Sequence, residues 1–243
     1  MIVVIQCAGR KRGRAGFLKT RDGTPVSFVA QPQLAPPAER RVYARPDDLS
    51  DLGGSWREQL LAYNENPGDN PLGLLPAFEL YENEIYRALV TRFGMERTYI
   101  LSAGWGLINA AFLTPSYDIT FSASAEDFVR RRNGDFYRDF CMLPNDVGGP
   151  IVFFGSRGYV PLFAELTRFV KGEKTVFYSA SQPPVAPGCL LERFDTRKRT
   201  NWQYECATAF LSGEAKTAEL PSAQPRRNAR FRDHRQWPFL VIV

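Results

Sequence analysis

The chain has 243 residues, a hydrophobic fraction of 44% and a formal net charge of +5. These values fit one globular domain with a substantial core and exclude an intrinsically disordered chain. No apolar run approaches the roughly 20 residues that span a bilayer, and no cleavage-type signal follows the apolar N-terminus. We therefore expect a cytoplasmic protein that does not contact a membrane.

The cysteine and histidine content argues against a metal centre. The four cysteines (Cys7, Cys141, Cys189 and Cys206) have no CxxC spacing, and His234 is the only histidine. Neither GxGxxG nor GxxxxGK[ST] occurs, so no dinucleotide or P-loop site is predicted. We expect no metal and no cofactor, and acid–base chemistry that depends on carboxylates, tyrosines or a cysteine.

Apolar runs predict the first elements of the chain. Residues 1–6 read as a strand, and the proline- and glycine-bearing stretch 13–73 as a loop-rich insertion, with a possible β-hairpin or lid that covers or extends the site. Within it, residues 24–30 are a candidate strand and residues 57–63 a candidate short helix. Helical spacing then predicts a helix over 74–93 that stops at Gly94, before a strand over 98–101.

The second half continues the alternation. We expect a helix over 125–143 with Ser124 as its N-cap, a strand over 151–154, a helix over 161–170, a strand over 174–178 and a helix over 202–213. This order predicts an α/β fold with a Rossmann-like, mostly parallel sheet flanked by helices. Residues 1–213 would form one domain and residues 214–243 a basic tail or arm, whose last residues, 239–243, form a strand or dock on the body.

Three predicted strands each end in small and polar residues. The strand at 1–6 ends in Cys-Ala-Gly-Arg-Lys-Arg (7–12), that at 98–101 in Ser-Ala-Gly-Trp-Gly-Leu (102–107), and that at 151–154 in Gly-Ser-Arg-Gly-Tyr (155–159). Ligands of open α/β sheets bind outside the carboxyl ends of the strands. We therefore expect these three tips to line one crevice.

Positive charge is concentrated in four clusters: residues 10–14, 130–132, 197–199 and 226–235. Such clusters suit contacts with phosphate, although a single basic run is more often solvated surface. Four of them in one chain favour a nucleic acid or nucleotide as partner. The sequence does not indicate the oligomeric state.

The motifs resemble those of the DUF6884 family and, more distantly, the YaaA peroxide-stress family. The resemblance rests on Ile-Gln-Cys-Ala-Gly-Arg-Lys (5–11), Leu-Tyr (80–81), Tyr-Ile-Leu-Ser-Ala-Gly-Trp-Gly-Leu-Ile (99–108), Pro-Ser-Tyr-Asp-Ile-Thr (115–120) and Phe-Gly-Ser-Arg-Gly-Tyr (154–159). It departs from the family pattern at Ala8, Gly9 and Trp105. The resemblance implies DNA binding and protection from oxidative damage, or action on bases or nucleosides alongside base-modifying and defence systems.

The candidate catalytic residues are Asp118, Tyr117 and Cys7. Asp118 can stabilise an oxocarbenium-like sugar or act as a general base; the alternative is an aspartate that caps loop amides. Cys7 can act as a nucleophile activated by nearby cations, or be a small buried hydrophobe. Tyr117 can stack on a base, or belong to the core.

The candidate substrate-binding residues come from the same three tips. Arg10 and Lys11 can hold phosphate or form an exposed basic turn. Glycines and serines at strand tips let a ligand approach the backbone, but tight turns need the same residues. Aromatic residues there can stack on a base or lie in the core. The remaining members of the set are Ser102, Trp105, Gly155, Ser156 and Tyr159.

Together these observations predict an enzyme directed at a nucleobase, nucleotide or nucleic acid that cleaves or exchanges an N-glycosidic bond. The alternative is a non-catalytic DNA- or RNA-binding stress or defence protein, which needs only the basic clusters. A small-molecule-binding or scaffold protein is a third possibility.

Overall fold

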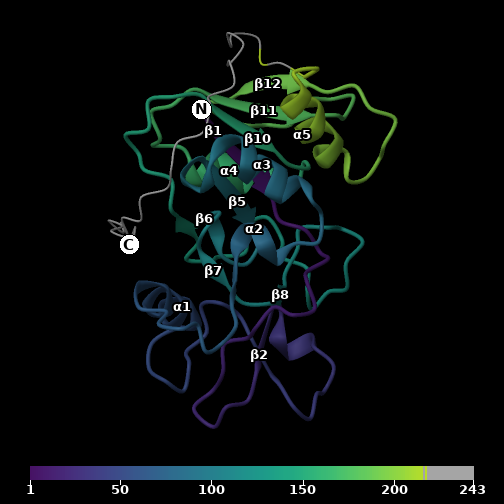
Figure 1. Ribbon diagram of the computed structural model, residues 1–243. Helices are drawn as coiled ribbons and strands as arrows, with labels where there is room; N and C mark the ends of the chain where they lie inside the picture. Colours follow the sequence, from purple (N-terminus) through teal and green to yellow (C-terminus); the bar gives the residue numbers. More distant parts are fainter. Residues whose placement is uncertain (216, 218–243) are drawn as a thin grey trace.

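A seven-stranded, mostly parallel sheet forms the centre of the computed structural model, which describes residues 1–215 and 217 (Figure 1). In spatial order its strands are β12 (Leu190–Arg193), β11 (Lys174–Tyr178), β10 (Ile151–Phe154), β1 (Ile2–Gln6), β5 (Thr98–Ser102), β6 (Gly106–Asn109) and β9 (Phe140–Cys141). Only the β5–β6 pair is antiparallel. The predicted Rossmann-like α/β architecture is confirmed.

Helices cover both faces of this sheet, which explains why its inner strands are continuous apolar runs. Successive residues of a strand point to opposite faces. Phe153 stacks on Phe163 of α4 (Val160–Leu166), with ring centroids 4.4 Å apart, whereas Phe154 packs edge-on against Phe210 of α5 (Trp202–Ser212). Helix α3 (Ile85–Phe93) contacts α5 and therefore lies on the α5 side.

The order of the parallel strands defines where a ligand would be expected. Numbered along the chain, β1, β5, β10, β11 and β12 lie in the order 2-1-3-4-5, a common order of doubly wound sheets. The chain proceeds from β1 to one side and then returns to the other side of β1 at β10. The switch point, where such folds bind ligands, is therefore the crevice between the carboxyl ends of β1 and β10.

The insertion at 13–73 contributes two strands to a second, three-stranded sheet. Its strands are β3 (Val42–Ala44), β2 (Val26–Val29) and β8 (Tyr117–Asp118), in that order and all parallel. A short antiparallel hairpin leads into β2: Lys19 bridges Pro25, the Val26 N–H donates to Leu18 O at 2.8 Å, and Gly23 in the turn has a φ of +88°. Strands β2 and β3 themselves run in the same direction. A short 3-10 helix, η1 (Pro32–Leu34), and helix α1 (Trp56–Glu65) complete the segment. Figure 1 shows α1 and β2 at the opposite end of the molecule from β11, β12 and α5.

The insertion contributes to the hydrophobic core. Phe28 of β2 and Leu60 of α1 are fully buried, and Trp56 at the start of α1 is 3% exposed. The helix begins with a capping box: Ser55 Oγ accepts from the Glu58 backbone N–H, and the Glu58 carboxylate accepts from the Ser55 backbone N–H. The helix expected over 57–63 is thus confirmed, and α1 extends it by one residue at the N-terminus and two at the C-terminus.

The helix expected over 74–93 is interrupted. The segment contains β4 (Leu75–Pro76), which pairs with β7 (Leu113–Thr114), then α2 (Ala77–Leu80) and, after a break at 81–84, α3. At the break Tyr81 is extended and forms an antiparallel bridge with Lys11. Pairing with the tip of β1 therefore replaces one turn of helix. A 3-10 helix, η2 (Met95–Arg97), then leads into β5.

The helix expected over 125–143, with Ser124 as its N-cap, is wrong. The segment consists of turns and the short strand β9, and Gly134 has a φ of +104°. Arg130 forms a parallel bridge with Thr120, and the backbone N–H of Arg131 donates to Thr120 O at 2.8 Å. These contacts between distant residues satisfy backbone groups that a helix would have used.

The remaining elements agree closely with the sequence. The strand at 174–178 and the helix at 202–213 are confirmed as β11 and α5, and the helix at 161–170 is shorter, as α4. No helix in the described part of the chain is long and apolar enough to cross a membrane. The expectations for 218–243, including the strand at 239–243 and the fourth basic cluster, lie outside the described residues.

Candidate active site

The three polar tips lie at one edge of the sheet, because β10, β1 and β5 are adjacent and parallel. Hydrogen bonds connect the tips of β10 and β1 directly. The Ser156 backbone N–H donates to Gln6 Oε1 at 2.6 Å, and Cys7 Sγ shares a hydrogen bond with Tyr159 Oη at 3.2 Å. The tips of β1 and β10 therefore meet at the switch point, whereas a crevice lined by all three tips stays a prediction.

A chain of buried hydroxyl groups connects the β5 tip to the other elements. Ser102 Oγ donates to Tyr117 Oη at 2.8 Å, and Tyr117 Oη shares a second bond of 2.8 Å with Tyr81 Oη. Ser102 Oγ also accepts the backbone N–H groups of Gly104 and Trp105, at 3.2 and 3.0 Å. Ser102 thus holds the turn after β5 and fixes the position of Tyr117.

Burial keeps these tyrosines protonated. Desolvation, with a further contribution from the nearby Cys7, raises the pKa of Tyr81, Tyr117 and Tyr159 well above the ordinary value. Their hydroxyls are therefore neutral donors and acceptors at physiological pH. They order the site and do not supply charge.

Lys11 brings a cation to this cluster. Its Nζ lies 4.2 Å from the centroid of the Tyr117 ring and donates to the carbonyl oxygens of Ala8 and Gly9, at 3.3 and 3.4 Å. Desolvation lowers the pKa of this half-buried amine, while the charges of Cys7 and Asp118 act in the opposite direction. A lysine with a lowered pKa is a better proton donor near neutral pH than an ordinary lysine.

Asp118 is exposed on β8, next to the buried Tyr117. Its carboxylate accepts no hydrogen bond from any described residue, so within this part of the chain it does not cap a loop. It is close enough to Lys11 for its charge to raise the pKa of that amine. An unpartnered carboxylate and a cation of lowered pKa are therefore both present at the sheet edge.

Arg10 is exposed, but the rest of its basic cluster is largely used within the fold. Arg12 donates to Glu79 O at 3.0 Å and forms an ion pair of 3.1 Å with Glu84. Arg14 pairs with Glu79 at 3.3 Å. Of this cluster, Arg10 is the cation left available to a phosphate among the described contacts.

Trp105 lies in the core and not at the crevice. It is fully buried, packed edge-on against Phe28 at 5.0 Å and Tyr117 at 6.4 Å, with the Arg57 guanidinium 5.6 Å from its ring. Its indole therefore does not offer a free face to a base. The ring of Tyr117 is also buried, and it lies beneath Lys11. Tyr117 therefore supports the Lys11 cation.

Cys7 is 3% exposed, and its thiol is bonded to Tyr159. Burial does not favour a nucleophilic role, which remains a prediction. Gly155 is buried, and a Cβ added to it would lie 2.1 Å from the Phe153 ring. The chain therefore needs glycine here to turn sharply at the end of β10, beside Ser156.

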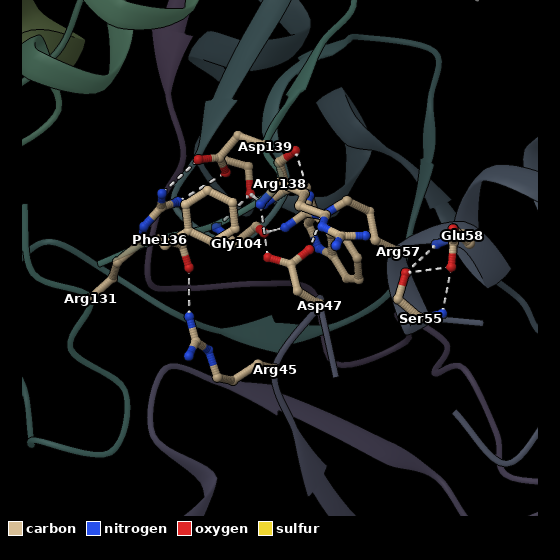
Figure 2. A network of polar contacts seen from close by, with 12 residues as sticks. Arg45, Asp47, Ser55, Arg57, Glu58, Gly104, Arg131, Phe136, Arg138 and Asp139 are labelled. Carbon is tan, nitrogen blue, oxygen red and sulfur yellow. Dashed lines mark hydrogen bonds and ion pairs between the residues drawn. The ribbon is translucent and has the colours of Figure 1, made fainter. Parts of the chain in front are cut away.

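Two buried arginines, Arg57 and Arg131, hold the turn that follows β5 (Figure 2). Arg57 donates to Trp105 O at 3.0 Å and Gly104 O at 2.9 Å, and its Nε pairs with Asp47 at 2.6 Å. Arg131 donates to Ala103 O at 2.8 Å and forms a bidentate pair with Asp139. Part of the predicted second basic cluster is thus an internal clamp, because Arg131 is buried and Arg130 pairs with Asp127.

The sequence indicates no role in the site for Tyr81 or Arg57, and it marks Arg131 only as a member of a basic cluster. Tyr81 has a detectable signal, since it belongs to the Leu-Tyr motif of the resemblance, but the helical spacing of 74–93 places it inside a helix. Nothing in the spacing of Arg57 or Arg131 distinguishes a buried clamp from a surface charge.

In the described part of the chain no group of three or more His, Cys, Asp or Glu side chains could hold a metal ion. Comparison with protein-family models, curated proteins and solved structures finds no match for this chain. The resemblance to the DUF6884 and YaaA families therefore stays a prediction.

Proposed function

We propose that this protein acts on a nucleobase compound that carries phosphate, a nucleotide or a nucleic acid, and cleaves or exchanges its N-glycosidic bond. The observation that carries the proposal is the proximity of the exposed Asp118 carboxylate, which accepts no hydrogen bond from a described residue, to the Lys11 amine, whose pKa burial lowers and the charge of Asp118 raises. Lys11 follows β1, a strand that flanks the switch point where doubly wound folds bind their ligands, and Asp118 lies near it on β8 of the second sheet.

Each group has a role in such a reaction. Asp118 would stabilise positive charge on the sugar as the bond breaks, or activate the attacking water. Lys11 would supply the proton that the departing base requires. Tyr117 and Ser102 would position Lys11 and the β5 tip through their hydrogen bonds. In hydrolysis water adds to the sugar and the base leaves with one proton, so no other reactant is needed.

The test is release of a free base from nucleoside monophosphates and from short DNA and RNA strands, followed by chromatography. We expect Asp118→Asn and Lys11→Gln each to reduce the rate by about 10²-fold or more, the usual size of a general acid–base contribution. Asp146→Asn is the matched control, because Asp146 is exposed in the loop before β10, at the opposite edge of the sheet. Absence of base release from every substrate would contradict the proposal.

A non-catalytic nucleic-acid-binding protein is the second candidate. Exposed cations at the same sheet edge, such as Arg10 and Arg157, favour it. Under this alternative, binding of an oligonucleotide falls steeply with added salt, the bound strand stays intact, and Asp118→Asn leaves the affinity unchanged.

A further inference from the structure

A cavity of about 560 Å³ lies beside the crevice, at the carboxyl ends of β10 and β11. Gly155 and Ser156, at the tip of β10, form one wall, and the segment before α5 forms another. Because the Ser156 backbone is bonded to Gln6, next to Cys7, the cavity shares this wall with the candidate active site. It therefore adjoins the tips of β10 and β1.

Four cations line the cavity, and three of them have no counterion among the described residues. Its charged residues are Arg157, Arg197, Lys198 and Arg199, and no aspartate or glutamate lines it. Lys198 forms an ion pair with Glu205 at 3.5 Å. Within the described residues, the guanidinium groups of Arg157, Arg197 and Arg199 have neither a hydrogen-bond nor an ion-pair partner. Three free guanidinium groups around one hollow repel one another unless an anion binds between them.

The chemistry of these groups identifies the anion. Arginine presents a planar fork that bonds two oxygens of a phosphate at once, and several arginines suit a group with more than one negative charge. The neutral hydroxyl and amide groups of the lining add hydrogen-bond capacity, and Tyr178 and Trp202 add aromatic surface. Phosphate recognition beside aromatic rings is the combination that a nucleotide requires.

Size separates a single nucleotide from a polynucleotide. Pockets for small ligands have volumes of about 300–1,000 Å³, and this cavity lies within that range. A polynucleotide instead needs a groove in which cations follow successive phosphates. The cations of this cavity surround one hollow, while Arg130 and Arg131 of another basic cluster are bound within the fold.

We propose that this cavity binds the phosphate group of a free nucleotide through Arg157, Arg197 and Arg199. The inference rests on the proposed function: with its phosphate held there, the sugar and base extend over the Gly155–Ser156 wall toward Lys11 and Asp118. The substrate class is therefore a free nucleotide, and a nucleoside without phosphate or a nucleic acid strand is a poorer ligand.

The test is isothermal titration calorimetry at about 0.1 M ionic strength. The probes are AMP, GMP, CMP and UMP, their nucleosides, and a short single-stranded DNA. We expect at least one nucleotide to bind, and its nucleoside to bind at least tenfold more weakly. Arg197→Ala with Arg199→Ala should weaken nucleotide binding by about a hundredfold, tenfold for each charge-assisted contact.

The control is Arg40→Ala with Lys171→Ala, which removes the same charge from exposed loops elsewhere. It should change the affinity by no more than about twofold if the contacts are local. Both arginines of the test pair are also exposed, so neither variant should unfold, and thermal melting checks this. Equal losses in the two double variants, equal binding of nucleotide and nucleoside, or binding of the DNA strand alone would each overturn the inference.

The base-release assay on the same variants separates this inference from the proposed function. Arginine-dependent nucleotide binding without base release would retain the phosphate site and refute the glycosidic reaction. Base release that is insensitive to Arg197→Ala with Arg199→Ala would retain the reaction and refute the phosphate site.

Discussion

Replacement of Arg57 by methionine should destabilise the protein strongly, because its charged group is buried and fully engaged. The side chain of Arg57 is 5% exposed and that of its partner Asp47 is 16% exposed. Methionine keeps most of the apolar stem but removes the ion pair and both bonds to the carbonyls of Gly104 and Trp105. The substitution therefore leaves the Asp47 carboxylate without its counterion, bonded only to the Arg138 backbone N–H, and two carbonyl groups without their donor.

The size of the effect follows from these losses. Breaking a buried ion pair from one side costs about 3–5 kcal/mol, and each buried polar group left without a partner costs about 1–3 kcal/mol. Since the costs overlap and water reaches Asp47 in part, we expect a loss of about 3–5 kcal/mol. With a urea m-value of about 2–3 kcal/mol/M, the midpoint of unfolding should fall by about 1–2 M.

The assay is urea denaturation followed by circular dichroism, with Arg168→Met as the matched control. Arg168 pairs with Glu165 at 2.7 Å, but the two side chains are 54% and 61% exposed, so its replacement should cost about 0.5 kcal/mol or less. Adding Asp47→Leu to Arg57→Met should recover part of the loss, because it removes the stranded charge. If Arg57→Met lowers the free energy of unfolding by less than about 1 kcal/mol, the contacts of Arg57 do not determine the turn between β5 and β6.

Two further predictions concern the site itself. Ser102→Ala removes the acceptor of the Gly104 and Trp105 amides and the donor to Tyr117. Urea denaturation should therefore show a free energy of unfolding lower by about 1–3 kcal/mol. An equal decrease for Ser212→Ala, at the exposed end of α5, would contradict this role. Burial lowers the pKa of Lys11 in the folded protein below its ordinary value of 10.5. At a pH below this lowered pKa, folding must bury a charged amine, which reduces the free energy of unfolding. This penalty disappears as the pH rises toward 10.5. Lys11→Met should therefore be more stable than the parent protein at pH 7, with a gain that shrinks at alkaline pH, as measured by thermal melting across a pH series; a gain that grows with pH would contradict the assignment.

The central sheet could be predicted from the sequence because its strands are buried on both faces. The run Ile-Val-Val-Ile-Gln of β1 is buried throughout, and β10 and β5 show the same pattern. Such runs mark parallel strands without knowledge of their neighbours. The small residues that follow each run mark the three tips that the fold brings to one edge, since the carboxyl ends of adjacent parallel strands share it.

The insertion and the 103–143 segment could not be predicted in the same way, because contacts between distant residues determine them. Strand β2 pairs with β3 in parallel across a connection of only twelve residues, and with β8 from a distant part of the chain. In 125–143 Ser124 looks like the N-cap of a helix, yet Tyr137 is buried against Arg131, whose guanidinium lies 3.8 Å from the Tyr137 ring centroid. Periodicity carries no information about such a partner.

The clamp explains why the site edge is ordered although it has little regular structure. A turn at the end of a strand leaves carbonyl groups without a partner in the sheet, and burial makes each of them costly. Here Ala103, Gly104 and Trp105 receive donors from Arg131 and Arg57, which come from outside the central sheet. Ser102 satisfies the amides of the same turn from its own strand end. The arginine side chains thus supply the hydrogen bonds that a neighbouring strand would otherwise donate. Because the insertion supplies Arg57, it is required to hold the β5 tip against Tyr117 and Lys11.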